Sequence, residues 1–123
     1  MDRNNSELEL AEKIIKVLDG RKAGNIKLLK VSEKTIIADY FVICSGNSST
    51  QVGALCDELE FRMGQIGVQP ARTEGRNTSL WIVLDFHSVI VHIFSSETRK
   101  YYNLERLWGE AEEIDISHLL DES

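Results

Sequence analysis

The chain has 123 residues, enough for one domain with a substantial core, and its 42% hydrophobic and 28% charged residues are typical of globular proteins. No apolar run approaches the ~20 residues that a membrane-spanning helix needs, and the polar, acidic start is unlike a signal or transit peptide, so we expect a cytoplasmic protein without a membrane partner. The net charge of −6 lies at the C-terminal end, because residues 105–123 hold seven of the 20 acids and only one of the 14 basic residues.

The N-terminal third predicts one helix followed by two strands. Ser6 and Glu9 form a capping-box pattern, and apolar residues then recur at helical spacing up to a glycine, which predicts a helix over residues 6–19. Apolar and β-branched residues predict strands over residues 25–31 and 35–45.

A polar turn and a second helix come next. Gly46 begins the turn, and Ser48 or Ser49 can cap the helix that follows, which we expect to end at Gly67. The apolar stripe of this helix comprises Val52, Leu55, Cys56, Leu59, Met63 and Ile66.

The second half predicts three more strands. A short strand covers residues 71–73, and residues 80–85 and 89–94 form a hairpin whose two faces are both apolar, so we expect both faces to be covered. Residues 97–108 are typical of broken helical turns, and the acidic end can add a marginal strand or helix. We assign the following hairpin residues to the core: Leu80, Ile82, Ile90 and Phe94.

This order of elements predicts an α/β (α+β) fold with a single mixed β-sheet flanked by helices. We expect one domain over residues 1–110 and an acidic C-terminal tail over residues 111–123. Such a tail repels nucleic acid and favours a basic protein partner, although a solvated end that keeps the protein soluble explains it equally simply.

The patterns for catalysis are weak. A glycine–serine turn that opens a helix, as at Gly46, is also found in nucleotidyltransferases, but those enzymes need paired carboxylates on the next strand, and residues 70–73 contain no acid. Helix capping explains the turn better. The three histidines are scattered without metal-ligand spacing, so we expect no metal and no cofactor. The two cysteines, Cys44 and Cys56, are expected to be buried free thiols.

Aromatic residues concentrate between Leu80 and Trp108, with both tryptophans and the vicinal Tyr101 and Tyr102. Large aromatic side chains with polar tips are favoured where one protein docks on another. We therefore expect a protein-binding surface, since Tyr102, Leu107 and Trp108 are unlikely to be buried together at the end of so small a fold.

Three motifs resemble the ribosomal silencing factor family (RsfS, also called Iojap). They are ADYFVICSGNS at residues 38–48, the hairpin with Trp81, Leu84-Asp85 and VIVHIF at residues 89–94, and YNLERLW at residues 102–108. Two departures stand out. His87-Ser88 replaces the family's common Gly-Asp, so the turn type can differ, and Ser95-Ser96-Glu97 replaces His-Pro-Glu, of which only the glutamate matches.

The resemblance implies a non-enzymatic factor with a nucleotidyltransferase-like fold that lacks the catalytic acids. It implies binding to the large ribosomal subunit through ribosomal protein L-fourteen, which blocks association with the small subunit and represses translation under nutrient limitation. The partner-binding residues that we predict are Trp81, Asp85, Tyr101, Tyr102, Leu104, Glu105, Leu107 and Trp108. Two alternatives remain open: a divergent nucleotidyltransferase-like enzyme, and a homodimeric interaction scaffold.

Overall fold

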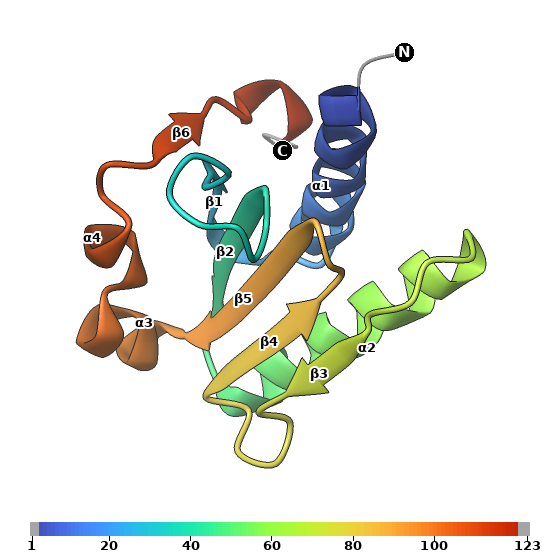
Figure 1. The fold of residues 1–123 in the computed structure, drawn as a ribbon. Coiled ribbons are helices and arrows are strands. Elements are labelled where there is room, and N and C mark those ends of the chain that lie inside the picture. Colours follow the sequence, from blue (N-terminus) through green and yellow to red (C-terminus); the bar gives the residue numbers. More distant parts are fainter. Residues whose placement is uncertain (1–2, 121–123) are drawn as a thin grey trace.

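The computed structural model describes residues 3–120, with side chains from residue 6 onward, and its centre is one six-stranded sheet (Figure 1). The elements, in chain order, are α1 (Arg3–Gly20), β1 (Gly24–Lys30), β2 (Tyr40–Gly46), α2 (Ser49–Gln65), β3 (Arg72–Glu74), β4 (Trp81–Asp85), β5 (Val89–Ser95), α3 (Ser96–Tyr102), α4 (Leu104–Leu107), β6 (Glu112–Ile114) and a short 3-10 helix (Ser117–Leu119).

The sheet is mixed, as predicted. Its strand order is β3-β4-β5-β2-β1-β6. The central pair, β2 and β5, is parallel, and every other neighbouring pair is antiparallel. Parallel strands are normally buried on both faces, and all seven residues of β2 are buried.

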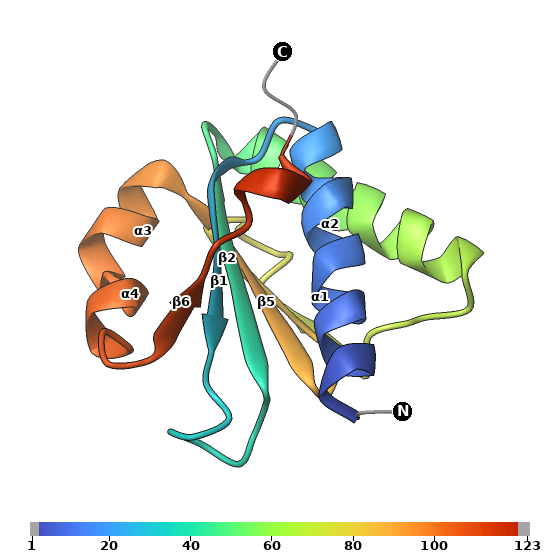
Figure 2. The same cartoon turned by 90° about the horizontal axis from the view of Figure 1, so that it is seen from above.

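Helices lie on both sides of the sheet (Figure 2). α1 and α2 pack on one face and form the larger core with the inward side chains of the strands. α3 and α4 lie on the other face, where Leu104 completes a smaller core around Phe41 and Phe94. Side chains alternate along each strand, so successive residues point alternately into the larger and the smaller core.

Helix capping follows the sequence closely in α2. The hydroxyl of Ser48 accepts a hydrogen bond from the N–H of Gln51 at 3.1 Å, as predicted for an N-cap. Gly67, with φ of 79°, follows the helix end and takes the left-handed conformation that glycine adopts without strain. Five residues of the predicted stripe are buried, whereas Ile66 is 53% exposed because it lies past the last helical residue.

Two boundary predictions were wrong at the N-terminal end. α1 begins at Arg3, so Ser6 lies inside the helix and does not cap it. The strand predicted over residues 35–45 begins only at Tyr40, because the N–H groups of Lys34 and Thr35 both bond to the carbonyl of Val31 and turn the chain. The residues that follow this turn form a loop rather than a strand.

The hairpin turn keeps an unusual backbone conformation. His87 has φ of 72°, in the left-handed region that favours glycine. One carboxylate oxygen of Asp85 accepts a hydrogen bond from the His87 N–H at 2.8 Å and steadies this turn. Asp85 therefore has a structural role within its own hairpin.

The acidic end continues the sheet past residue 110. β6 pairs with β1, and Ile116 is only 7% exposed in the larger core. Glu113 lies 4.0 Å from the Lys27 ammonium on the neighbouring strand. The last three residues of the predicted tail, 121–123, lie outside the described residues.

We predict that Ile116→Ala lowers the free energy of unfolding by about 2–4 kcal/mol, because it removes buried methyl groups and leaves a cavity between β6 and α1. Chemical denaturation measures this loss. Ile36→Ala is the matched control: Ile36 is 103% exposed, so its stability change should stay within about 0.5 kcal/mol. Equal stability of the two variants would show that the acidic end is not part of the core.

Candidate functional site

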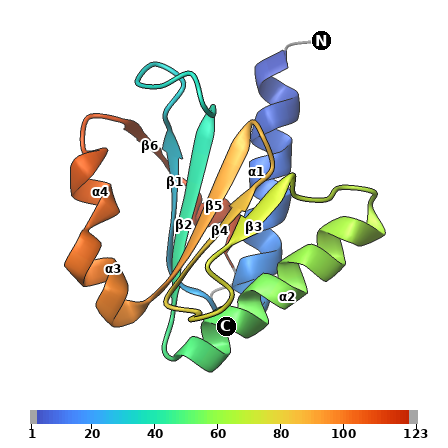
Figure 3. The same ribbon diagram turned by 60° about the horizontal axis from the view of Figure 1, so that its bottom comes forward.

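The sheet face opposite α1 and α2 is only partly covered. α3 and α4 lie beside β5, β2 and β1, and among residues 3–120 only the end of α3 reaches β4 on this face, leaving most of β3 and β4 without a covering helix (Figure 3). Trp81, Val83 and Asp85 of β4 point to this open face and are each half-buried. The prediction that both faces of the hairpin are covered was therefore wrong for β4.

Large apolar side chains gather at the edge of this open face. Leu80 is 48% exposed, so its assignment to the core was wrong: it precedes β4 and is only partly covered by its neighbours. Tyr101 is 78% and Tyr102 is 58% exposed on α3. With Trp81 these side chains line a pocket of about 440 Å³. To Leu80, Trp81, Tyr101 and Tyr102 we add Leu107, which is 78% exposed on the following helix α4, and we call these five residues the docking patch.

A second pocket of about 420 Å³ lies on the same face. Its apolar walls are Ile37, Val83 and Ile90, and its charged lining includes Arg72 and Asp85. The loop before β2 supplies Ile37, 63% exposed. Sequence analysis missed this loop, because two consecutive β-branched residues favour a strand and nothing in the pattern marks them as exposed.

Contacts with three aromatic side chains fix the position of the Trp81 indole. Its indole N–H donates to Nδ1 of His92 at 3.2 Å, and its ring stacks on Phe94 with the ring centres 4.8 Å apart. Tyr102 packs against the same indole at 5.1 Å. Aromatic contacts of this kind add about 0.5–1.5 kcal/mol beyond burial, so Trp81 is presented in one orientation.

The bend between α3 and α4 is held by a buried arginine. Arg99 is 7% exposed, and its guanidinium donates two hydrogen bonds to the carboxylate of Glu105, at 3.1 and 3.2 Å, and one to the hydroxyl of Ser45 at 2.7 Å. Asn103 separates the helices with a left-handed φ of 49°. Burial raises the pKa of Glu105, but the hydrogen bonds and charge of Arg99 outweigh it, so the pKa lies below its usual range.

The predicted partner-binding residues fall into two groups. Tyr101, Tyr102 and Leu107 are exposed, and Trp81 and Trp108 are half-buried. The remaining three have roles inside the domain. Leu104 is 8% exposed and belongs to the smaller core, so it offers almost no surface. Asp85 steadies the hairpin turn and lies 3.8 Å from Arg72, and Glu105 is occupied by Arg99.

The described residues carry little that would support catalysis. Within residues 3–120 no group of three or more histidine, cysteine or acidic side chains is placed to hold a metal ion. β3 extends to Glu74, so the strand is not free of acids as predicted, but this single carboxylate is exposed and lies three strands from Gly46. Across the same stretch, no helix is long and apolar enough to span a membrane.

Comparison with known proteins matches this chain to one protein family. Residues 4–123 match the family model described as ribosomal silencing factor during starvation (RsfS). The ribosomal silencing factor RsfS of Halalkalibacterium halodurans is 36% identical over 94% of this chain and 98% of its own length. The RsfS of Haemophilus influenzae is 40% identical over 83% of this chain and its whole length. A crystal structure of a Chromobacterium violaceum protein superimposes with a TM-score of 0.80 at 29% identity, covering 83% of this chain and 85% of the other.

We predict that acid weakens the fold through His92, which supports Trp81. Burial lowers the pKa of His92 from 6.5 to about 4. Between these values the unfolded chain binds a proton that the folded chain does not, so stability falls as the pH drops from 6.5 to about 4, by on the order of 3 kcal/mol.

Denaturation at several pH values tests this effect. His92→Gln keeps an acceptor for the indole but cannot titrate, so the dependence over this pH range should flatten. His87→Asn, at the exposed hairpin turn, is the control variant that removes a different histidine. Identical pH profiles for wild type and His92→Gln would contradict the assignment.

Proposed function

The chain belongs to the ribosomal silencing factor family, and from that premise we propose that it binds the large ribosomal subunit through ribosomal protein L-fourteen and sterically blocks association with the small subunit. Translation is thereby repressed under nutrient limitation. The protein acts in the cytoplasm and needs no cofactor and no catalytic step.

The observation that carries this proposal is the docking patch. Tyr101 and Leu107 are each 78% exposed, and Tyr101 lines one pocket with Leu80, Trp81 and Tyr102. A contiguous exposed apolar patch marks an interaction site, whereas a single exposed apolar side chain does not. Binding energy in protein interfaces concentrates in a few aromatic anchors that fill pockets. The pocket beside Trp81 gives a partner side chain a place to insert, and the rigid support of Trp81 lowers the entropy lost on binding.

Charged residues around the docking patch have a smaller role. Glu97 lines the pocket beside Trp81, and the exposed Glu110 and Glu112 follow α4. These free carboxylates, rather than Glu105, are the acids available to basic groups of the ribosomal protein. Exposed ion pairs add about 0–1 kcal/mol each, so they orient the partner and speed association more than they hold it.

Self-association is the second candidate use of the same surface. An exposed apolar patch can pair with its copy in a symmetric dimer, and the ribosomal partner would then compete for it. Light scattering of the free protein, with and without purified L-fourteen, separates a dimer that dissociates on binding from a permanent scaffold.

We predict that the double variant Tyr102→Ala with Leu107→Ala lowers affinity for large ribosomal subunits at least ~30-fold, the effect of losing one strong interface anchor. Both side chains are mostly exposed, so the fold should survive. Co-sedimentation with purified subunits measures the loss, and the same variant should fail to reduce formation of complete ribosomes from separated subunits.

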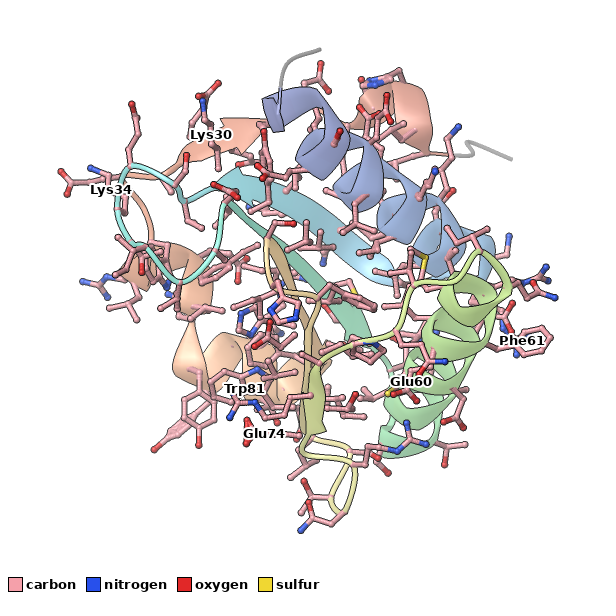
Figure 4. All side chains as sticks on the ribbon, turned by 45° about the vertical axis from the view of Figure 1, so that its right-hand side comes forward. Lys30, Lys34, Glu60, Phe61, Glu74 and Trp81 are labelled. Atoms are coloured by element: carbon pink, nitrogen blue, oxygen red, sulfur yellow. The ribbon has the colours of Figure 1, made fainter. Side chains whose placement is uncertain are left out.

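The matched control is Phe61→Ala with Ile66→Ala. These residues are 60% and 53% exposed, and Figure 4 shows Phe61 projecting from α2, well apart from Trp81. This control should bind and inhibit as the wild type does. Wild-type binding by a folded Tyr102→Ala, Leu107→Ala protein would rule out the docking patch, and equal loss in the control would show that binding responds to apolar area in general.

A further inference from the structure

A polar pocket of about 440 Å³ lies apart from the docking patch, beside the bend between α3 and α4. It lies at the carboxyl ends of β2 and β5, the two parallel strands, where Ser45 and Ser96 form part of its lining. In open α/β sheets, ligands bind in the crevice outside the carboxyl ends of parallel strands. Its volume falls within the range of small-molecule sites, roughly 300–1,000 Å³.

Several side chains of this pocket have hydrogen-bond donors with no acceptor partner among the described residues. Asn25, Lys100 and Asn103 line it, and none of these side chains has a hydrogen bond or ion pair to any residue that the structure describes. Lys27 has one ion pair within residues 3–120, to Glu113 at the long distance of 4.0 Å, and its charge also helps to lower the pKa of Glu105. Ammonium groups have only hydrogens to offer, and amides offer two hydrogens each. Four donor side chains therefore surround one space.

The charged acceptor of the pocket and its serine hydroxyls already have partners, which leaves the amide oxygens of Asn25 and Asn103 as its unpaired side-chain acceptors within residues 3–120. Its one carboxylate, Glu105, accepts both hydrogen bonds from Arg99, and the Ser45 hydroxyl accepts a third from the same guanidinium. The pocket therefore has three cationic side chains against one anion, although the whole chain has a net charge of −6. A ligand that satisfies such a lining brings negative charge and several acceptor oxygens.

We propose that this pocket binds the phosphate group of a small phosphorylated molecule. Phosphate oxygens accept charge-assisted hydrogen bonds from ammonium and amide groups, and these bonds are roughly twice as strong as neutral ones. Lys27 and Lys100 supply the charge, Asn25 and Asn103 supply directed donors, and the Arg99–Glu105 pair holds the wall on which Lys100 and Asn103 lie.

A second basic pocket differs because its arginines already have an acidic partner. It lies between α1 and α2, has a volume of about 570 Å³, and is lined by Lys16, Arg21 and Arg62. There Glu58 lies 3.6 Å from the Arg21 guanidinium and 2.8 Å from that of Arg62, so both arginines have a partner. This pocket is an internal control for simple attraction between anions and basic residues.

The test is titration of the ¹⁵N-labelled full chain with sodium pyrophosphate, with sodium chloride balancing the ionic strength. We expect saturable shifts at Lys27, Ser96 and Asn103 and none around Lys16. Lys100→Gln should weaken binding about tenfold, the contribution of one hydrogen bond to a charged group. Lys100→Arg should retain most of the affinity, and Lys16→Gln should change nothing.

Adenosine 5′-monophosphate and a short single-stranded RNA distinguish the sources of the phosphate. Saturable binding of the nucleotide, weakened by Lys100→Gln, supports a small ligand. Three results would overturn the proposal: pyrophosphate shifts that do not saturate, equal weakening by Lys16→Gln and Lys100→Gln, or RNA binding that depends on Lys100 while neither small molecule binds.

Discussion

Arg99 is only 7% exposed, so its positive charge must be balanced by partners inside the protein. The local geometry supplies Glu105 and Ser45 as these partners. Glu105 lies six residues away, so the chain must turn back sharply, and the left-handed Asn103 makes the turn between α3 and α4. Removing one partner of a buried ion pair typically costs about 3–5 kcal/mol, because the other charge stays unmatched. Together with the packing of Leu104 and Trp108 on Phe41, this pair stabilises the bend between α3 and α4.

Both candidate sites of the molecule lie next to the Arg99–Glu105 ion pair. On one side, α3 presents Tyr101 and Tyr102 next to the uncovered β4, which creates the docking patch. On the other side, the same bend presents Lys100 and Asn103 to the polar pocket at the ends of β2 and β5. A full-length helix across the sheet would have buried the aromatic residues and closed the pocket. The cost of the open arrangement is apolar surface left in water, which a binding partner can cover.

Much of this fold was predictable from local patterns, and the errors share a physical origin. The hairpin of β4 and β5 and the Ser48 cap follow from alternation and capping chemistry, which act over a few residues. Ile36 and Ile37 wrongly predict a strand, because β-branching favours a strand wherever no long-range contact opposes it. Arg99 and Ile116 are buried through residues distant in sequence. Nothing in the local pattern marks Arg99 as buried, and Ile116 lies within the stretch predicted as an acidic tail.

We propose that the open sheet face, and not the helical face, meets the large ribosomal subunit. Hydrogen–deuterium exchange of the full chain, free and bound to purified large subunits, tests it directly. We expect slower exchange in residues 78–85 and 96–108, which carry the docking patch, and unchanged exchange along α1 and α2. Protection confined to α1 and α2, with residues 96–108 exchanging as in the free protein, would contradict it.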